Sequence, residues 1–170
     1  MLFRSNYLWA KSWGGGVDTG LNDDDHGHSV AVDSSGNVYV TGKFRNTVDL
    51  DPGAGTTEFT ADGQNVFLSK LDSSGDLVWA KSFGGGGGGN SVAVDSSGNV
   101  YTTGSFSGTA DFDPGAGTAN LTTISSYTDV FVSKLDSSGN YVWAKQFGGT
   151  LYGQGYSVVV DSSGNVYTTG

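Results

Sequence analysis

The sequence is poor in several residue types, and each shortage excludes a class of protein. The 170 residues include no cysteine, so neither a disulfide framework nor thiol chemistry is available. Only 8 basic residues stand against 17 acidic ones, which argues against nucleic-acid phosphate and anionic membranes as partners. No apolar run approaches the roughly 20 residues that a membrane-spanning helix needs. Cations and partners with basic patches are compatible with this charge.

Residues suited to catalysis are scarce as well. The only two histidines, His26 and His28, lie in one segment, so a Ser-His-Asp arrangement is not expected. The glycine run 84–89 is not followed by Gly-Lys-Ser/Thr and opens no helix, so it is not a phosphate-binding loop. We therefore expect no enzymatic activity and no required cofactor. Residues 1–7 lack the apolar region of a signal peptide, which fits either a removed signal or an internal piece of a longer chain.

Glycine is abundant, with 29 residues, and it recurs in turns. The stretch 92–104 recurs as 30–42 and 158–170, and each copy is typical of a β-hairpin. In its Asp-Ser-Ser-Gly turn, Asp accepts a hydrogen bond from a backbone N–H two residues on, and Gly adopts the positive φ of a G1 bulge. The sequence holds five such structural turns, which run from Asp33 to Gly36, Asp72 to Gly75, Asp95 to Gly98, Asp136 to Gly139 and Asp161 to Gly164.

The hairpins belong to a longer repeat. The spacing is 62 residues from Asp33 to Asp95 and 66 from Asp95 to Asp161, and each period holds four expected strands. Self-similarity at such a period, with four strands per unit, predicts β-propeller blades. Both faces of segments 130–132 and 141–144 are apolar, as expected for sheets covered on both sides. One Trp on the fourth strand of each unit is predicted to fill space between blades: Trp9, Trp79 and Trp143.

We therefore expect an all-β fold of propeller-type, four-stranded antiparallel blades in one repeat domain, 1–170, forming an incomplete ring. Its predicted parts are the last strand of a preceding blade (1–13), two full blades (29–83 and 91–147) and the first two strands of a further blade (157–170). The open edge at 166–169 would offer unpaired backbone groups to another chain. Three accounts of the missing strands fit the sequence: a piece of a longer chain, copies that close a ring or extend a fibre, and an open stack of sheets.

The repeat signature resembles that of a known family. It runs Val-Asp-x-x-Gly-Asn-Val-Tyr-x-Thr-Gly, then Asp-Phe-Asp-Pro-Gly, then Val-Phe-Val-x-Lys-Leu-Asp-x-x-Gly and Trp-Ala-Lys, and its first part occupies 32–42, 94–104 and 160–170. This pattern resembles the bacterial β-propeller repeat (SBBP-type) family. The resemblance implies large, secreted or surface-attached bacterial proteins, hence an extracellular or cell-surface location, and no shared catalytic activity. The chain departs from it in having too few repeats for a ring.

The Asp-x-Asp-Pro-Gly-x-Gly motif, in a long connection between the second and third strands, is the best candidate metal site. In extended backbone Asp49 and Asp51 share one side, as do Asp111 and Asp113. Calcium takes six to eight oxygens, and Asp129, with Asn65 at the same repeat position, offers a further one. The alternative is a Pro-Gly turn in which each Asp caps its own backbone.

A second candidate is the acidic connector 23–28, Asp-Asp-Asp-His-Gly-His. Its two imidazoles and carboxylates suit a transition metal, whereas a solvated acidic loop explains the same composition. For the whole chain, the first hypothesis is a structural or adhesive module that assembles with copies of itself or belongs to a longer chain. The second is a propeller that binds glycan or protein through its loops, and the third is a propeller hydrolase or lyase.

Overall fold

The structure, a computed structural model, describes residues 9–14 and 25–170. Two four-stranded antiparallel sheets form its body, and we name them blade 1 and blade 2. Blade 1 consists, in spatial order, of β1 (His26–Val32), β2 (Val38–Asp49), β3 (Glu58–Leu71) and β4 (Leu77–Phe83). Blade 2 consists of β5 (Gly88–Val94), β6 (Val100–Phe106), β9 (Asp129–Leu135) and β10 (Tyr141–Phe147).

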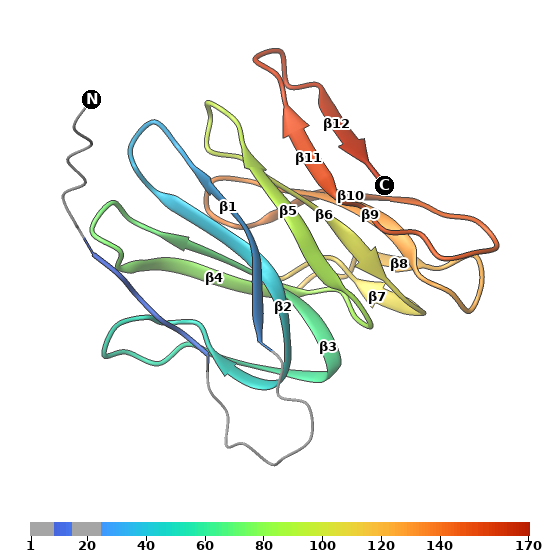
Figure 1. Cartoon of the computed structure of the whole chain (residues 1–170), viewed down its shortest axis with the longest axis horizontal. Helices are drawn as coiled ribbons and strands as arrows, with labels where there is room; N and C mark the ends of the chain where they lie inside the picture. Colours follow the sequence, from blue (N-terminus) through green and yellow to red (C-terminus); the bar gives the residue numbers. More distant parts are fainter. Residues whose placement is uncertain (1–8, 15–24) are drawn as a thin grey trace, which may run out of the picture.

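Two small two-stranded sheets complete the described residues. The third hairpin, β11 (Ser157–Val160) and β12 (Val166–Thr169), repeats the first two strands of a blade, and we call it the half-blade. The other is a ribbon of β7 (Thr109–Asp111) and β8 (Asn120–Thr122). Figure 1 shows blade 1, blade 2 and the half-blade side by side, with β1, β5 and β11 in succession and no closed ring. The prediction of an all-β fold of four-stranded antiparallel units is confirmed.

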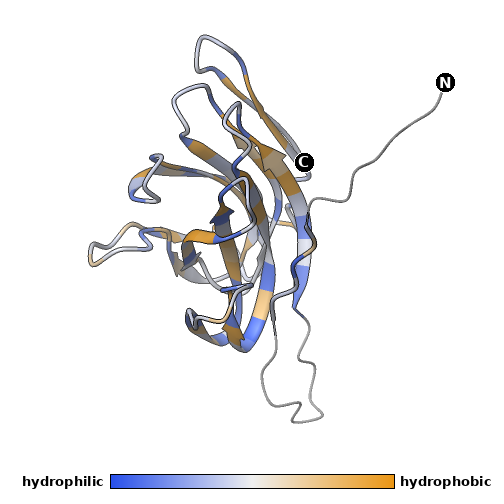
Figure 2. Ribbon diagram, turned by 90° about the vertical axis from the view of Figure 1, so that its left-hand side faces the viewer, coloured by the Kyte–Doolittle hydropathy of each residue, from blue (hydrophilic) through white to orange (hydrophobic). Residues whose placement is uncertain are grey.

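The core lies between the sheets as well as within them. Tyr39, Leu68 and Phe83 of blade 1 join Phe106 and Phe131 of blade 2 in one buried cluster. A smaller cluster joins blade 2 to the half-blade. Figure 2 shows the apolar residues concentrated on the strands. Since each sheet buries apolar side chains against a neighbouring sheet, burial between blades is a main source of stability.

The long connection that the sequence predicted between the second and third strands is itself largely paired in blade 1. In blade 1, β2 and β3 stay paired as far as Asp49 and Glu58, so the Asp-Pro-Gly loop is a hairpin tip. The register shifts at Arg45 and Asn46, and Asn46 adopts a φ of 57°, which Asn tolerates better than most residues. In blade 2 the same segment forms the separate ribbon β7–β8.

Two strands begin earlier than the sequence predicted, which moves several residues out of connectors. β1 begins at His26 and β5 at Gly88, so both histidines and the end of the glycine run are in strands. Glycine at 42 and 104 permits this, because a Cβ there would collide with the carbonyl oxygens of His26 and Gly88. The expected strand 1–13 and the acidic run 23–25 fall largely outside the described residues. None of the described residues forms a helix that is long and apolar enough to cross a membrane.

Candidate functional site

The aspartates of the Asp-Ser-Ser-Gly turns use their oxygens within the turn. Asp33 Oδ1 accepts the backbone N–H groups of Ser35 at 2.9 Å and Asn37 at 3.0 Å. Its Oδ2 accepts the Asn37 amide at 2.7 Å and the hydroxyl of buried Tyr39 at 3.0 Å. The turns that begin at Asp95 and Asp161 repeat the same four bonds. These carboxylates therefore organise the hairpins and have little capacity left for chemistry.

The same hydrogen bonds set the protonation behaviour of the turns. Burial raises the pKa of Asp33, but the hydrogen bonds from Asn37, Tyr39 and Ser35 outweigh it, and the pKa lies below its ordinary value. The pKa of Asp95 is lowered against burial in the same way. Burial, followed by the hydrogen bond to Asp33, raises the pKa of Tyr39. The turns are thus built around an ionised carboxylate and a neutral tyrosine.

Trp9 and Trp79, which occupy the same position of the repeat, each donate a hydrogen bond to the blade that follows them, although residues 9–14 form no strand. Trp9 Nε1 donates to the carbonyl of Ser73 at 3.1 Å, in the β3–β4 turn of blade 1, and Lys11 pairs with Asp76 at 3.4 Å. Trp79 Nε1 donates to Ser137 O at 3.2 Å, in the β9–β10 turn of blade 2. The two indoles lie against the turn glycines Gly75 and Gly139, where a Cβ would come within 2.8 Å of Trp9 and 3.3 Å of Trp79.

The first strands of neighbouring units also make polar contacts that the sequence did not reveal. Ser29 Oγ accepts the backbone N–H of Val92 at 3.2 Å, and Ser91 Oγ accepts that of Val158 at 3.2 Å. The only signal in the sequence is that serine precedes the same valine in all three hairpins. A bond repeated between units 1 and 2 and between units 2 and 3 defines one recurring blade-to-blade interface.

The two histidines lie two residues apart on β1, with ring centroids 6.0 Å apart. His28 Nδ1 donates to the carbonyl oxygen of Gly89 at 2.9 Å, so it takes part in the contact with blade 2. Asn90, its equivalent in blade 2, donates to Gly155 O at 2.9 Å. This position therefore links adjacent units, whichever of the two residues occupies it.

One end of the stack exposes residues that are buried elsewhere in the chain. Val30 on β1 is 63% exposed, whereas its equivalents Val92 and Val158 are 6% and 3% exposed. The difference follows the neighbours: blade 1 covers Val92 and blade 2 covers Val158. We call the surface with Val30 and the exposed Val32 the first face.

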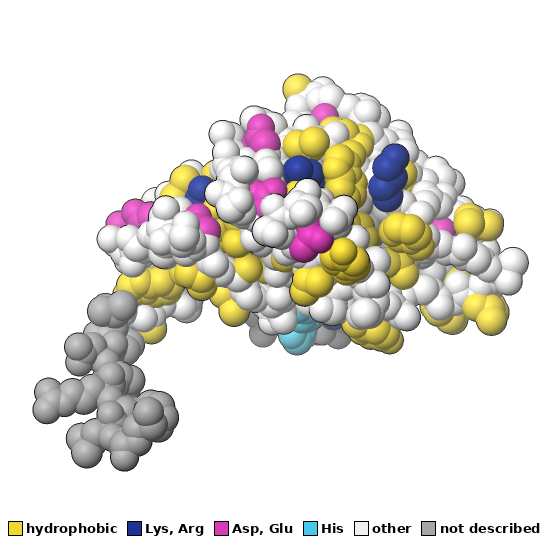
Figure 3. Space-filling view, turned by 90° about the horizontal axis from the view of Figure 1, so that it is seen from above, with side chains coloured by type: hydrophobic (Ala, Val, Ile, Leu, Met, Phe, Trp, Pro, Cys, Tyr) yellow, Lys and Arg dark blue, Asp and Glu magenta, His cyan; other side chains and the backbone are white. Residues whose placement is uncertain are grey.

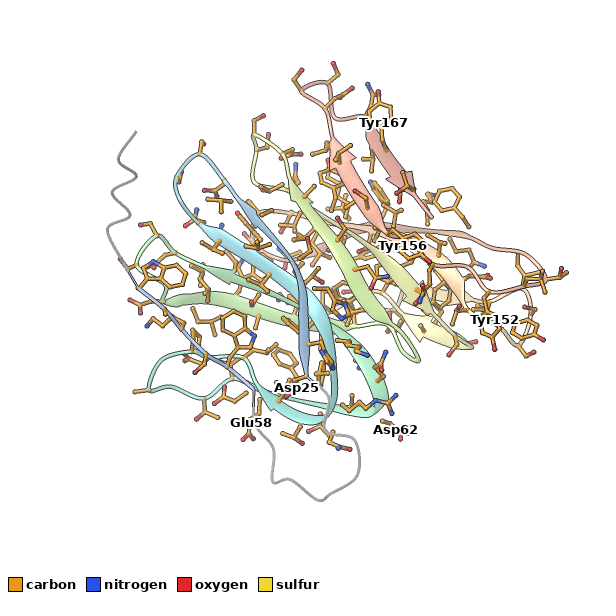
Figure 4. All side chains as sticks on the ribbon, viewed as in Figure 1. Asp25, Glu58, Asp62, Tyr152, Tyr156 and Tyr167 are labelled. Carbon is orange, nitrogen blue, oxygen red and sulfur yellow. The ribbon has the colours of Figure 1, made fainter. Side chains whose placement is uncertain are left out.

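The opposite end shows the converse pattern. Tyr39 and Tyr101 are 0% and 1% exposed beneath the following unit, whereas Tyr167 on β12 is 56% exposed. Phe147 and Val159 are exposed with it. Figure 4 places Tyr167 along the side of the molecule formed by the half-blade and the loop leading to it, with Tyr152 and Tyr156. We call this surface the last face. The two faces are the uncovered halves of the recurring interface.

In the Asp-Pro-Gly loops, one oxygen of each aspartate accepts hydrogen bonds from the backbone of the same loop. Asp49 Oδ1 accepts two backbone N–H groups, at 3.0 and 2.8 Å, and Asp51 Oδ1 accepts one at 2.7 Å. Asp111 and Asp113 repeat these distances. The hydrogen bonds from the Thr57 and Asp51 amides lower the pKa of Asp49. The geometry matches the capped Pro-Gly turn that was the alternative to calcium.

Asp129 is buried and is held by blade 2 itself. Its Oδ2 accepts the N–H of Ile124 at 3.1 Å and the Gln146 amide at 3.2 Å, while Oδ1 has no hydrogen-bond partner in the described structure. The equivalent Asn65 donates to Ser82 Oγ at 3.4 Å. Across residues 9–14 and 25–170, no group of three or more His, Cys, Asp or Glu side chains is placed to hold a metal ion. Asp129 is thus not gathered with the loop carboxylates, and calcium binding stays a prediction.

A groove of about 390 Å³ runs between the first turns of the two blades. It is lined by Asp33, Asp95 and Lys70 together with turn serines. Figure 3 views the side of the molecule that carries these turns and shows acidic, basic and apolar side chains interspersed. The groove has hydroxyl groups and mixed charge, which suit a neutral polar ligand better than a strongly charged one.

Comparison with known proteins agrees with the repeat architecture. A family model described as "SBBP: Beta-propeller repeat" matches residues 15–43, 78–112 and 142–170. Over 96% of its length the chain is 28% identical to the "Uncharacterized WD repeat-containing protein L264" of Acanthamoeba polyphaga mimivirus. Over 81% it is 32% identical to the "Regulatory protein FlaEY" of Caulobacter vibrioides. The chain spans only 13% and 14% of these two proteins.

Proposed function

The chain belongs to the SBBP β-propeller repeat family, and from this premise we propose that it is a structural module of an extracellular or cell-surface bacterial protein. In this role the blades form a scaffold, and their two end faces are covered by further blades, either of copies or of a longer chain. The observation that carries the proposal is the exposure of Val30 and Tyr167 at positions where every equivalent residue is buried by a neighbouring unit.

The hydrogen bonding of the chain supports a scaffold rather than an enzyme. The turn aspartates bond their own backbone, and His28 bonds the next blade. In the described residues the only buried side-chain polar atoms without a partner are Ser69 Oγ, Asp129 Oδ1 and Ser133 Oγ. Ser69 and Ser133 occupy the same position of the repeat, so their unpaired hydroxyl groups do not distinguish a site in one blade from the other blade. Within residues 9–14 and 25–170 these side chains are thus used for contacts within hairpins and between blades, which supports a scaffold role.

Association of the chain with itself tests the proposal. Sedimentation velocity at increasing concentration should show growth of assemblies, because each first face complements a last face. Val30→Asp should suppress this growth by placing a charge in the interface. Val78→Asp is the matched control, since Val78 is an exposed strand valine of the same blade, and its equivalent Val142 is also exposed. Growth that Val30→Asp and Val78→Asp affect equally would contradict the proposal, and a chain that stays monomeric at every concentration would exclude copies of this chain as the covering blades.

The groove between Asp33 and Asp95 favours a second candidate function, the binding of glycan or protein by the turns. Its hydroxyl lining can form hydrogen bonds with sugar hydroxyls. A glycan array separates the two functions: saturable binding that Lys70→Ala abolishes supports the ligand-binding role. An array without signal excludes glycan as the ligand of the groove.

A further inference from the structure

Two loops of blade 2 carry exposed aromatic side chains. The loop 123–128 leads from β8 into β9, and the connector 148–156 leads from β10 to β11. Both lie at the opposite end of the strands from the Asp-Ser-Ser-Gly turns, because β9 begins beside them at Asp129 and ends at Leu135, just before its turn. These loops are therefore separate from the groove between the turns.

Hydrogen bonds hold the loop and the connector together. Gly153 N–H donates to Thr128 O at 2.8 Å, and Thr128 Oγ1 donates to Gly153 O at 3.0 Å. Blade 1 has a matching pair of bonds, from Gly86 N–H to Gln64 O at 2.8 Å and from the Gln64 amide to Gly87 O at 2.9 Å. The frame that joins these two segments is thus a constant feature of the repeat.

The side chains that stand next to this frame differ between the blades. Tyr127 and Tyr152 each come directly before one residue of the frame in blade 2. In blade 1 the same two positions are occupied by Gly63 and Gly85. Binding residues are concentrated on variable loops that a rigid scaffold positions, so a difference of this kind between similar blades indicates a site.

The two tyrosines, which we call the tyrosine pair, form one surface. Their ring centres lie 4.5 Å apart, with the ring planes inclined by 57°. Tyr152 is 76% exposed and Tyr127 37%, and Ile124 and Leu151 in the same two segments are exposed as well. Figure 4 shows Tyr152 at the edge of the molecule. Large apolar side chains gathered on a surface in this way are typical of an interaction site.

This surface stays open where a further blade follows. Blade 2 follows blade 1, and yet Asp62 and Gly63 at the tip of the corresponding loop of blade 1 are exposed. In the connector between these blades Gly85 is half-buried and Gly86 is exposed, although blade 2 lies against both. The exposure of the tyrosine pair therefore follows from the place of these loops in the repeat.

The surroundings of the tyrosine pair are polar but uncharged. Residues 119–128 and 148–156 contain no Asp, Glu, Lys, Arg or His, in a chain with 17 acidic and 8 basic residues. The exposed side chains of Ser126, Thr150 and Gln154 make no hydrogen bond within residues 9–14 and 25–170. A sugar ring has apolar C–H faces and a rim of hydroxyl groups, so it matches aromatic rings bordered by neutral donors and acceptors. Nucleic acid would require basic side chains instead.

We propose that the tyrosine pair and its two loops bind a neutral polysaccharide. In this site a sugar ring stacks on Tyr127 and Tyr152, and its hydroxyl groups form hydrogen bonds with the neutral side chains around them. The inference goes beyond the scaffold role, because blade 2 and the connector after it form the site without a partner chain. It also accounts for two tyrosines at positions where the other blade has glycine.

The test uses the full chain and five neutral sugars: cellohexaose, xylohexaose, maltohexaose, mannohexaose and chitohexaose. We expect at least one of them to bind saturably in isothermal titration calorimetry. Tyr127→Ala and Tyr152→Ala should each weaken this binding about 3- to 10-fold, because each removes one aromatic face. Tyr127→Phe and Tyr152→Phe keep the ring and should bind as the parent does. Tyr167→Ala, at an exposed tyrosine of the half-blade, is the matched control and should leave the affinity unchanged.

An absence of binding by a folded chain across all five sugars would overturn the inference, as would alanine variants that bind as tightly as the parent. Equal losses in the alanine and phenylalanine variants would refute stacking on the rings. If Tyr152→Ala abolishes self-association in sedimentation velocity, a second copy covers the surface and the inference is wrong. Val30→Asp and Lys70→Ala, which test the scaffold and the groove, should leave sugar binding unchanged, so the three proposals fail separately.

Discussion

Phe83 and Phe147 offer a direct test of how much stability one blade gains from the next. They are equivalent last residues of the fourth strands, but Phe83 is 4% exposed and Phe147 is 55% exposed. Phe83 lies against blade 2, with its ring centre 6.0 Å from that of Phe112 and 6.3 Å from that of Phe131. Phe147 is followed only by the half-blade, which has no counterpart of Phe112 or Phe131.

The expected cost of Phe83→Ala follows from these contacts. Burial of the ring contributes about 2 kcal/mol, and the two aromatic pairs add roughly 1 kcal/mol each. With partial collapse of the cavity, we expect the free energy of unfolding to fall by about 3–5 kcal/mol. For a chain of this size the midpoint of thermal unfolding should fall by roughly 6–20 °C. Phe147→Ala should change the free energy by less than about 0.5 kcal/mol.

Urea unfolding followed by circular dichroism measures both variants, at a protein concentration where the chain is monomeric. The slope of the transition should stay constant while the midpoint moves only for Phe83→Ala. Equal losses for the two variants would refute the reasoning, because they would show that the fourth strand is stabilised within its own blade and not by the next one.

Three further predictions follow from the turns, the glycines and the acidic loops. The pKa values of Asp33 and Asp95 are lowered in the folded state, so their ionised forms stabilise the fold above about pH 4. This contribution is lost as the pH falls through the folded-state pKa values. Thermal melts should therefore show destabilisation only below about pH 4. Gly104→Ala should cost about 2–3 kcal/mol in urea unfolding, because its Cβ would meet Gly88 O and the Phe131 ring, whereas Gly149→Ala, with open space around it, should be neutral. EDTA should leave the circular dichroism spectrum unchanged, because backbone amides already hold the loop carboxylates; a collapse of the spectrum would show that a metal is required.

The features that could be predicted from the sequence are those encoded within a few residues. Asp33 and Gly36 define their turn locally, since the carboxylate binds amides two and four residues on and Gly36 adopts a φ of 81°. The four-strand unit followed from repetition of such turns. Apolar residues on both faces correctly predicted that β9 is covered, since Phe131 and Val132 are buried, but the same argument failed for β10, where Val142 is 46% exposed.

The features that could not be predicted depend on contacts between distant segments. The hydrogen bond from Val92 to Ser29 spans 63 residues, and nothing in the local sequence specifies it. His26 and His28 were assigned to a connector because acidic residues precede them, yet pairing with β2 places both in β1. Asp129 was grouped with the loop carboxylates by repeat position, but position in a repeat does not give distance in space.

The repeat also explains why function is to be sought at the ends of the stack. In a linear array each unit is stabilised by itself and by its nearest neighbours, so internal interfaces are saturated while the terminal ones are not. Here the internal interface uses the same valine, tyrosine and serine positions each time, which leaves Val30 and Tyr167 as the uncovered members. A surface that differs from the interior only by lacking its neighbour is most specific for a unit of the same sequence.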